Sequence, residues 1–184
     1  EQREEKFNRL KFQIRDLIAP YIYGEGEETL EEIIGKLLLK NGGTLAVAES
    51  CTGGAVSRRI TRVAGASAYF ACGAVTYSNE AKVRFLGVRT TTLDKHGPVS
   101  EETVIEMAEG IKRQAGTTVG LGVTGIAGPT GGSAEIPVGT VWVGLARGGR
   151  GEARRFRFHG DRERVILGAS QAALNCLRLA LLVP

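Results

Sequence analysis

The chain has 184 residues, of which 42% are hydrophobic and 24% are charged, and its net charge is +4. This length suits one globular domain, and the ordinary hydrophobic and charged fractions exclude a wholly disordered chain. The longest apolar runs are far short of the ~18 residues that a membrane span requires, so we expect no membrane partner.

The first 24 residues are expected to form a helical arm. Apolar residues recur irregularly as far as Pro20, Gly24 breaks the pattern, and the segment has too little apolar surface to fold alone. The chain opens with Glu1 instead of Met and shows no apolar signal segment, so it looks like a fragment of a longer protein. We therefore interpret residues 1–24 as a linker arm from an absent N-terminal domain and residues 25–184 as one domain.

Helices and strands alternate in the first part of the domain. Thr29 and Glu32 form a capping box, in which each side chain satisfies a free backbone N–H, and this box opens a helix that ends near Lys40. The elements predicted next are a strand at 45–48, a helix from 55 to about 63, a strand at 68–77, a helix at 79–86 and a helix after Ser100.

The second part of the domain adds three strands and a long helix. The predicted elements are a strand at 118–123, a Gly- and Pro-rich loop at 124–139, strands at 138–146 and 153–158, and a final helix capped by Asp161. The last two strands are close enough in sequence to pair as a hairpin. We predict the α/β fold class, as a three-layer α/β/α sandwich with a mixed, mostly parallel sheet and one antiparallel hairpin.

Three cysteines and two histidines limit the metal and disulfide chemistry that the chain could carry. Cys51, Cys72 and Cys176 form an odd and sparse set, which favours free thiols in a reducing cytoplasm over a disulfide-bonded secreted domain. Since there is no C-x-x-C pair and the only histidines are His96 and His159, we expect no structural zinc site.

Positive charge gathers at the end of the chain, where residues 145–184 carry eight Arg and Lys against three Asp and Glu. Such a region could contact nucleic acid or an anionic small molecule, or could simply be a solvated face. No aromatic-rich basic stripe accompanies the arginines, so we do not expect nucleic acid as a partner. Arg162 and Arg164 gain nothing from the dipole of the helix that they begin, which hints at a bound anion; ion pairs with Asp161 or Glu163 are the alternative.

Residues 120–125 match the dinucleotide-binding pattern G-x-G-x-x-G letter for letter. In a dinucleotide site the glycines form the turn after a strand and lead into a helix, and an acidic residue follows ~20 positions later. Here the first two glycines lie within a strand pattern, and Gly128 and Pro129 follow in place of a helix. We therefore assign no dinucleotide site to this segment.

The turn after the first predicted strand carries a stronger chemical signal. It consists of Ser50, Cys51, Thr52, Gly53 and Gly54. Its glycines allow a substrate to approach the backbone, and the N-terminus of the next helix favours developing negative charge, so the turn suits a nucleophilic serine with an oxyanion site. A capped turn without chemistry is the alternative, and Cys51 is the rival nucleophile because the same helix terminus could activate it.

A nucleophilic serine needs a base, and neither histidine lies in a context that suggests a Ser-His-Asp triad. Lys82 remains as a candidate in the first turn of a predicted helix, where the helix dipole disfavours an ammonium ion. Lowering its pKa from ~10.4 to about 7–8 takes roughly 4 kcal/mol, so burial is needed as well. A solvated Lys82 that pairs with Glu80 is the alternative.

Six segments occur in an order that resembles the C-terminal domain of the competence/damage-inducible CinA family, whose stand-alone form is a nicotinamide mononucleotide deamidase. They are residues 48–54, 75–82, 96–102, 123–129, 137–142 and 160–162. The similarity extends from about residue 28 to the end of the chain. Residues 21–24 also resemble the junction of two-domain members, which would place a molybdopterin-binding-like domain upstream.

The resemblance implies an amidohydrolase that needs no metal or other cofactor and converts the carboxamide of nicotinamide mononucleotide to a carboxylate, releasing ammonia. It implies a catalytic Ser–Lys pair at Ser50 and Lys82, assisted by the hydroxyl group of Tyr77. The expected substrate-binding residues are those of the turn, the loop and the last helix: Thr52, Gly53, Gly54, Thr124, Gly125, Ala127, Gly128 and Arg164.

Other functions stay open at this point. The main alternative is a non-catalytic nucleotide-binding module that regulates a two-domain CinA protein, and binding without product would indicate it. A nucleic-acid accessory domain, which would retain DNA in a salt-dependent manner, is the weakest hypothesis. The apolar side chains of the N-terminal arm need cover, which predicts a homo-oligomer, a dimer or higher.

Overall fold

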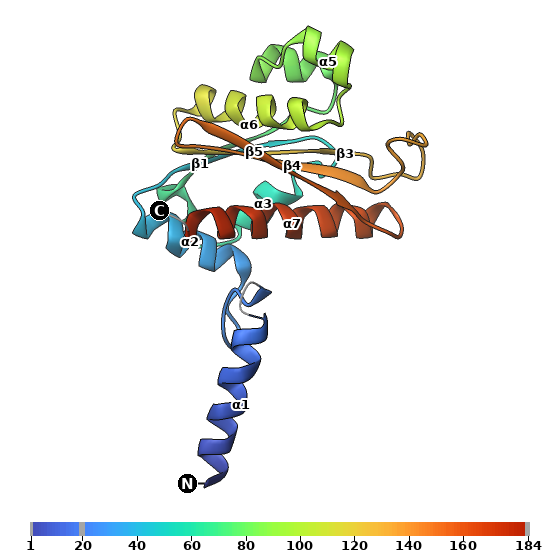
Figure 1. Cartoon of the computed structure of the whole chain (residues 1–184). Helices are drawn as coiled ribbons and strands as arrows, with labels where there is room; N and C mark the ends of the chain where they lie inside the picture. Colours follow the sequence, from blue (N-terminus) through green and yellow to red (C-terminus); the bar gives the residue numbers. More distant parts are fainter. Residues whose placement is uncertain (1, 19–20, 183–184) are drawn as a thin grey trace.

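A five-stranded mixed sheet forms the middle layer of the computed structural model, which describes residues 2–18 and 21–182 (Figure 1). The strands lie in the order β2-β1-β3-β4-β5 and comprise β1 (Leu45–Glu49), β2 (Phe70–Val75), β3 (Val119–Gly125), β4 (Thr140–Arg147) and β5 (Arg150–Arg157). β1 pairs in parallel with β2 and β3, whereas β4 pairs antiparallel with β3 and β5, so only β4 runs against the other strands. The predicted fold class and hairpin are confirmed, and the β3–β4 pairing adds a second antiparallel contact that we did not predict.

Helices cover both faces of the sheet (Figure 1). One face is covered by α6 (Glu101–Ala115), with α5 (Thr90–His96) outside it, and the other by α2 (Leu30–Lys40), α3 (Ala55–Thr61) and α7 (Arg162–Leu182). Short helical segments fill the connections: η2 (Ala66–Ala68), α4 (Asn79–Ala81) and η3 (Lys82–Leu86). The three predicted layers are therefore present.

Two apolar clusters hold the layers together. The larger cluster lies between the sheet and α2, α3 and α7 and includes Val47 and Leu174, and the smaller one lies on the α6 side and includes Ala46 and Met107. Successive residues of β1 thus alternate between the two clusters. Burial on both faces explains why this strand is an uninterrupted apolar run instead of an alternating one.

The glycines of the 120–125 pattern allow β3 to pack closely against α6. A Cβ atom at Gly120 would lie 2.1 Å from the carbonyl oxygen of Ala108, and one at Gly122 would lie 2.7 Å from that of Val104. Both glycines lie inside β3, as predicted. They therefore serve the contact between strand and helix.

We expect Gly120→Ala to lower the free energy of unfolding by about 3 kcal/mol, because the added methyl group collides with helix backbone. Gly122→Ala is expected to cost less, since its methyl group meets Val104 at a longer distance. Urea unfolding of both variants, followed by circular dichroism, measures the difference. A Gly120→Ala chain as stable as the parent would contradict this account of the β3–α6 contact.

The N-terminal helix α1 (Gln2–Ile18) projects away from the sandwich (Figure 1). None of its residues is buried, and its base is held by ion pairs of Lys11 and Arg15 with Glu25. The structure therefore has a helix within the predicted arm. The predicted stop at Pro20 lies outside the described residues, and the role of the arm as a linker stays a prediction.

α7 is the one helix in the described part of the chain that is long and apolar enough to cross a membrane by length and composition alone. The sequence has no uninterrupted apolar run of that length. In the structure 50% of the most apolar stretch of α7 is buried inside the domain, where the helix contacts the sheet, α2 and α3. Such burial is typical of a core helix.

Candidate active site

Three parallel strands bring the predicted site residues to one edge of the sheet. Ser50 follows β1 directly, Lys82 follows β2 after a short connection, and Thr124 lies near the end of β3. Because these strands run parallel, their carboxyl ends share one edge, which is where ligands bind in open α/β sheets. The loop after β3 and the first turn of α7 lie at the same end of the domain (Figure 1).

Ser50 and Lys82 lie within hydrogen-bond distance of each other, with 3.2 Å between Lys82 Nζ and Ser50 Oγ. Lys82 Nζ also donates to the backbone carbonyl groups of Thr76 at 2.9 Å and Tyr77 at 3.3 Å. Carbonyl oxygens can only accept, so they engage two N–H bonds of the amine, and the third position on the nitrogen faces the serine hydroxyl. In the neutral amine this third position is a lone pair that can accept the serine proton.

Burial lowers the pKa of Lys82. The residue is 1% exposed, so its ammonium form loses almost all hydration, and this loss is the largest influence on its pKa. The electrostatic effects of Cys51 and Glu80 are smaller and act in the opposite direction. The alternative of a solvated Lys82 is therefore wrong. A lowered pKa increases the fraction of neutral amine near neutral pH, and neutral amine is the form that can act as a base.

Cys51, the rival nucleophile, is buried beside Ser50. Burial raises the pKa of its thiol to about 12. At neutral pH the thiol therefore stays protonated, and a protonated thiol is a poor nucleophile. Of the two neighbouring side chains, Ser50 is the better candidate.

Glu49, for which the sequence predicts no role, has a fully buried carboxylate that organises the turn. It accepts hydrogen bonds from the N–H groups of Gly54, Val56 and Ser57 and from the Ser57 hydroxyl, at 2.7–3.1 Å. Four donors and the N-terminus of α3 thus compensate one buried negative charge. The carboxylate ties the end of β1 to the start of α3, with Ser50 between them.

Glu49 also corrects an expectation about the oxyanion site. The sequence predicts that the N-terminus of the helix after the turn faces the substrate, but the carboxylate of Glu49 occupies the N–H groups there. The N–H groups of Cys51 and Thr52, earlier in the turn, remain as candidate donors to an oxyanion.

Replacing Glu49 by Ala is expected to lower the free energy of unfolding by roughly 3–5 kcal/mol, because it leaves several N–H groups without their acceptor. Ser57→Ala removes one of the four donors and is expected to cost about 1 kcal/mol. Urea unfolding of both variants gives the comparison. If Glu49→Ala cost no more than Ser57→Ala, the carboxylate would not be what holds the turn.

Gly53 and Gly54 are required by the backbone conformation of the turn. Their φ angles are +59° and +100°, where residues with a side chain are strained, although a Cβ atom at Gly53 would meet no atom within 4 Å. The space beside Gly53 is therefore open. Thr52 is buried, and its hydroxyl group has no hydrogen-bond partner within the described residues, so it is a candidate contact for a ligand.

Tyr77 and Thr124 make contacts other than those expected. Tyr77 is 60% exposed, and its hydroxyl oxygen accepts a hydrogen bond from Arg162 Nη2 at 2.9 Å, while its backbone carbonyl contacts Lys82. Thr124 is buried, and its hydroxyl group donates to the carbonyl of Pro98 at 2.7 Å. The hydroxyl of Tyr77 is thus directed to an arginine, and that of Thr124 is engaged within the protein.

The residues of the loop after β3 and Arg164 also make contacts other than those expected. The side chain of Ala127 belongs to the larger apolar cluster, so only its backbone can contact a ligand. Gly125 packs closely against Thr140, and the carbonyl of Gly128 accepts a hydrogen bond from Arg162 Nη1 at 2.8 Å. Arg164 is exposed and lies against Gly160. Arg162 is therefore the arginine that hydrogen bonds tie to the site.

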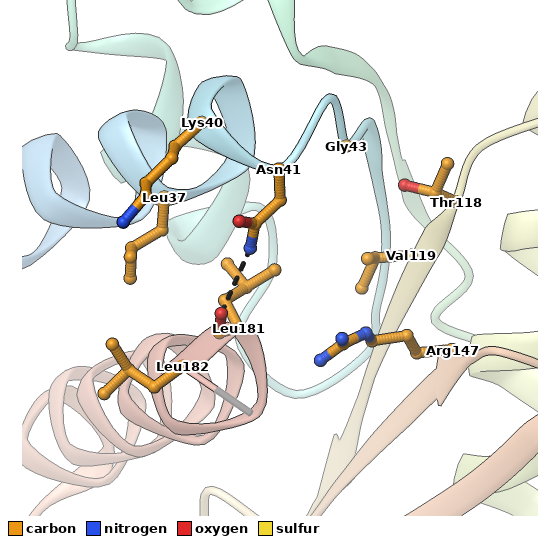
Figure 2. A pocket seen from close by; sticks show the side chains of 9 residues that line it. All are labelled: Leu37, Lys40, Asn41, Gly43, Thr118, Val119, Arg147, Leu181 and Leu182. Atoms are coloured by element: carbon orange, nitrogen blue, oxygen red, sulfur yellow. Dashed lines mark hydrogen bonds between the residues drawn. The ribbon is translucent and has the colours of Figure 1, made fainter. Parts of the chain in front are cut away.

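Two hollows of the surface lie away from Ser50. A hollow of about 450 Å³ lies at the C-terminal end of α7 (Figure 2). Here Asn41 Nδ2 donates a hydrogen bond to the carbonyl of Leu181 at 3.1 Å, and the guanidinium of Arg147 donates one to the carbonyl of Ala180. These donors satisfy carbonyl groups that a helix leaves free at its end. A hollow of about 900 Å³ continues along β5 and α7. Both lie toward the amino ends of β1 and β3. Ser50 and Lys82 meet at the opposite edge of the sheet, and this contact places the candidate site there.

No group of three or more His, Cys, Asp and Glu side chains in residues 2–18 and 21–182 is placed to hold a metal ion. The three cysteines are free thiols in the structure.

Comparisons with known sequences point to one family. The family model described as CinA C-terminal domain matches residues 27–181. A CinA-like protein of Kosmotoga olearia is 54% identical over 170 residues, which are 92% of this chain and 41% of that protein. A CinA-like protein of Geotalea daltonii is 49% identical over 168 residues, with 91% and 41% covered. The chain thus spans about two fifths of the length of these relatives.

Solved structures agree with the fold. A CinA superfamily protein of Klebsiella pneumoniae superposes with a TM-score of 0.80 at 38% identity, over 84% of this chain and 99% of that one. A CinA superfamily protein of Escherichia coli gives a TM-score of 0.77 at 30% identity, over 90% of this chain and 98% of that one. Nearly the whole length of each of these proteins is thus matched.

Proposed function

Because the chain belongs to the CinA family, we propose that it is an amidohydrolase that converts nicotinamide mononucleotide and water to nicotinate mononucleotide and ammonia. The observation that carries the proposal is the 3.2 Å contact between the buried amine of Lys82 and the hydroxyl group of Ser50. A serine beside a neutral amine has both the nucleophile and the base that amide hydrolysis requires.

The proposed reaction proceeds through an acyl-enzyme. Neutral Lys82 takes the proton of Ser50 as Oγ attacks the carboxamide carbon, and the N–H groups of Cys51 and Thr52 stabilise the oxyanion. The Lys82 ammonium then returns the proton to the departing nitrogen, so ammonia leaves and the acyl group stays on Ser50. Water, deprotonated by Lys82, cleaves the ester, and nicotinate mononucleotide leaves as Ser50 regains a proton.

The substrate-binding residues of the proposal surround this pair. The residues are Thr52, Gly53, Gly54, Thr124, Gly125, Ala127, Gly128 and Arg164, with Tyr77 assisting at the catalytic pair. The open space beside Gly53 and the unpartnered hydroxyl of Thr52 support the turn as a contact for the carboxamide. Ala127 would contribute through its backbone.

Incubating the purified chain with nicotinamide mononucleotide and assaying ammonia and nicotinate mononucleotide tests the proposal. We expect the two products in equal amounts. A calorimetric titration of the same preparation with the substrate separates the alternatives. Binding without product would favour the non-catalytic nucleotide-binding regulatory module, and neither binding nor product would contradict both functions.

The remaining proposals concern the setting of the domain. We propose that residues 1–24 are a linker arm to an upstream domain and that the chain forms a homo-oligomer, because the exposed apolar side chains of α1 need cover. The free thiols support a cytoplasmic location. We propose a small-molecule substrate and no membrane or nucleic-acid partner.

A further inference from the structure

Buried hydroxyl groups without a protein hydrogen-bond partner gather at the edge of the sheet that holds Ser50. Within the described residues, the buried side chains with such a polar atom are Thr52, Tyr69, Thr76 and Thr140. The three threonines lie at this edge, whereas Tyr69 precedes β2 at the opposite edge. Burying a hydroxyl group costs free energy unless it is hydrogen bonded, so such groups at a candidate site indicate a ligand or a bound reactant.

Thr76 lies beside Ser50 on the same face of the sheet. The N–H of Thr76 donates to the carbonyl of Glu49 at 2.8 Å, which continues the parallel pairing of β1 and β2 by one residue and sets Ser50 opposite Thr76. Two residues earlier in each strand, Ala48 and Ala74 pack in the smaller apolar cluster on the α6 side. Since side chains alternate along a strand and neighbouring strands lie about 4.8 Å apart, the two hydroxyl side chains are neighbours on that side.

Lys82 connects the two residues. Its Nζ donates to the backbone carbonyl of Thr76 at 2.9 Å and lies 3.2 Å from Ser50 Oγ. The side chain of Thr76 is 1% exposed, and its hydroxyl group bonds neither to Lys82 nor to Ser50. This hydroxyl group can donate one hydrogen bond and accept two. It is therefore an unused polar group beside the candidate nucleophile and base.

The second half of the proposed reaction needs a water molecule at this place. Once Ser50 carries the acyl group, its Oγ has no proton to give, and the lone pair of neutral Lys82 is free to accept a proton from water. The water has to lie beside the amine with its oxygen directed at the acyl carbon. A second hydrogen-bond partner fixes that direction, because a water held by the amine alone is free to turn.

We propose that Thr76 is a positioning residue, whose hydroxyl group holds the water that hydrolyses the acyl-enzyme. The inference rests on the proposed function and deepens it. The water oxygen bonds to the acyl carbon as one of its protons passes to Lys82 Nζ, while the other is held by Thr76 Oγ1. The bond from the acyl carbon to Ser50 Oγ then breaks, the Lys82 ammonium returns the proton to Oγ, and the carboxylic acid product loses its proton to solvent.

The ester 4-nitrophenyl acetate tests the inference, because it acetylates an activated serine whether or not the chain accepts nicotinamide mononucleotide. The burst of nitrophenolate reports acylation of Ser50, and mass spectrometry of the intact chain follows the loss of the acetyl group. We expect Thr76→Val to slow this loss about 10- to 100-fold and to change the rate of the burst less than about threefold. Thr76→Ser keeps the hydroxyl group and should lose the acetyl group within about threefold of the parent rate.

Thr140→Val is the matched control. Thr140 is also buried with an unpartnered hydroxyl group, but it begins β4, two strands away from β1. This variant should acylate and deacylate at the parent rates. Loss of the acetyl group from Thr76→Val at the parent rate would overturn the inference, and so would an equal slowing of both steps. If Thr76→Val fails to fold by circular dichroism, Thr76→Ala replaces it with the same expectations.

The inference and the proposed function can fail separately. A parent chain that is acetylated at Ser50 but releases no ammonia from nicotinamide mononucleotide contradicts the proposed function, and slow deacetylation of Thr76→Val would still support the inference. A parent chain that hydrolyses the mononucleotide, together with a Thr76→Val chain that deacetylates normally, contradicts the inference alone. A parent chain that forms no acyl group on Ser50 with either compound contradicts both.

Discussion

Ser50→Ala is expected to reduce ammonia release from nicotinamide mononucleotide by at least about 1,000-fold, because the variant lacks the oxygen that would form the acyl-enzyme. The fold should persist, since the removed hydroxyl makes one hydrogen bond, to Lys82. Steady-state assays with purified parent and variant measure the loss, and circular dichroism checks the fold.

Cys51→Ala is the matched control for Ser50→Ala, because it changes the adjacent buried residue by removing one sulfur atom. We expect it to keep most of the activity, since the thiol stays protonated at neutral pH. Undiminished turnover in Ser50→Ala, or activity that is lost in Cys51→Ala instead, would contradict the assignment of the nucleophile.

Lys82→Met is expected to lower kcat by about 100- to 10,000-fold, the usual range for loss of a general base. Methionine keeps an unbranched side chain of similar length in the buried position but has no amine to take the serine proton. The activity of the parent should rise with pH as Lys82 becomes neutral, below the ordinary lysine pKa of ~10.4, because burial lowers its pKa. A pH profile that is unchanged by Lys82→Met would contradict this role.

The same variant has a predicted effect on stability. Burial lowers the pKa of Lys82 in the folded chain, so between the folded pKa and the unfolded value of ~10.4 the unfolded state binds more protons. The free energy of unfolding of the parent therefore rises with pH across that window, relative to Lys82→Met, which has no such group. Urea unfolding of both chains from about pH 7 to 10.5 measures this difference, and a difference that does not change with pH would contradict the lowered pKa.

Most of the fold could be predicted because local signals and the global pattern agree. The capping box at Thr29 and the Asp161 cap both stand where the helices begin. α5 was missed because its sequence starts with three threonines, which are poor helix formers, and the helix is stabilised by tertiary contacts such as the bond from Thr92 Oγ1 to Glu106 on α6. Such tertiary contacts cannot be predicted from local sequence patterns.

The site could be predicted where its chemistry depends on residue type. It could be predicted less well where the chemistry depends on the direction in which a side chain points. Ser50 follows β1 and Lys82 follows β2, and these strands are parallel neighbours in the sheet, so both residues lie at the same edge. Their contact depends on this shared edge. The direction of the Glu49 carboxylate, toward α3 and away from a substrate, depends on how that helix packs on β1. Arg162 and Arg164 are equivalent by composition, and they differ in the structure because Arg162 donates hydrogen bonds to Gly128 and Tyr77.

The most direct test of the account is the rate at which a fluorophosphonate probe, which reacts with activated serines, labels Ser50 in the parent and in Lys82→Met. We expect labelling of the parent at Ser50, with a rate that rises with pH below the ordinary lysine pKa of ~10.4, and labelling of the variant at least about 100-fold more slowly. Mass spectrometry of the labelled peptide identifies the site. Equal labelling rates in the two chains, or a label on another residue, would contradict the claim that neutral Lys82 activates Ser50.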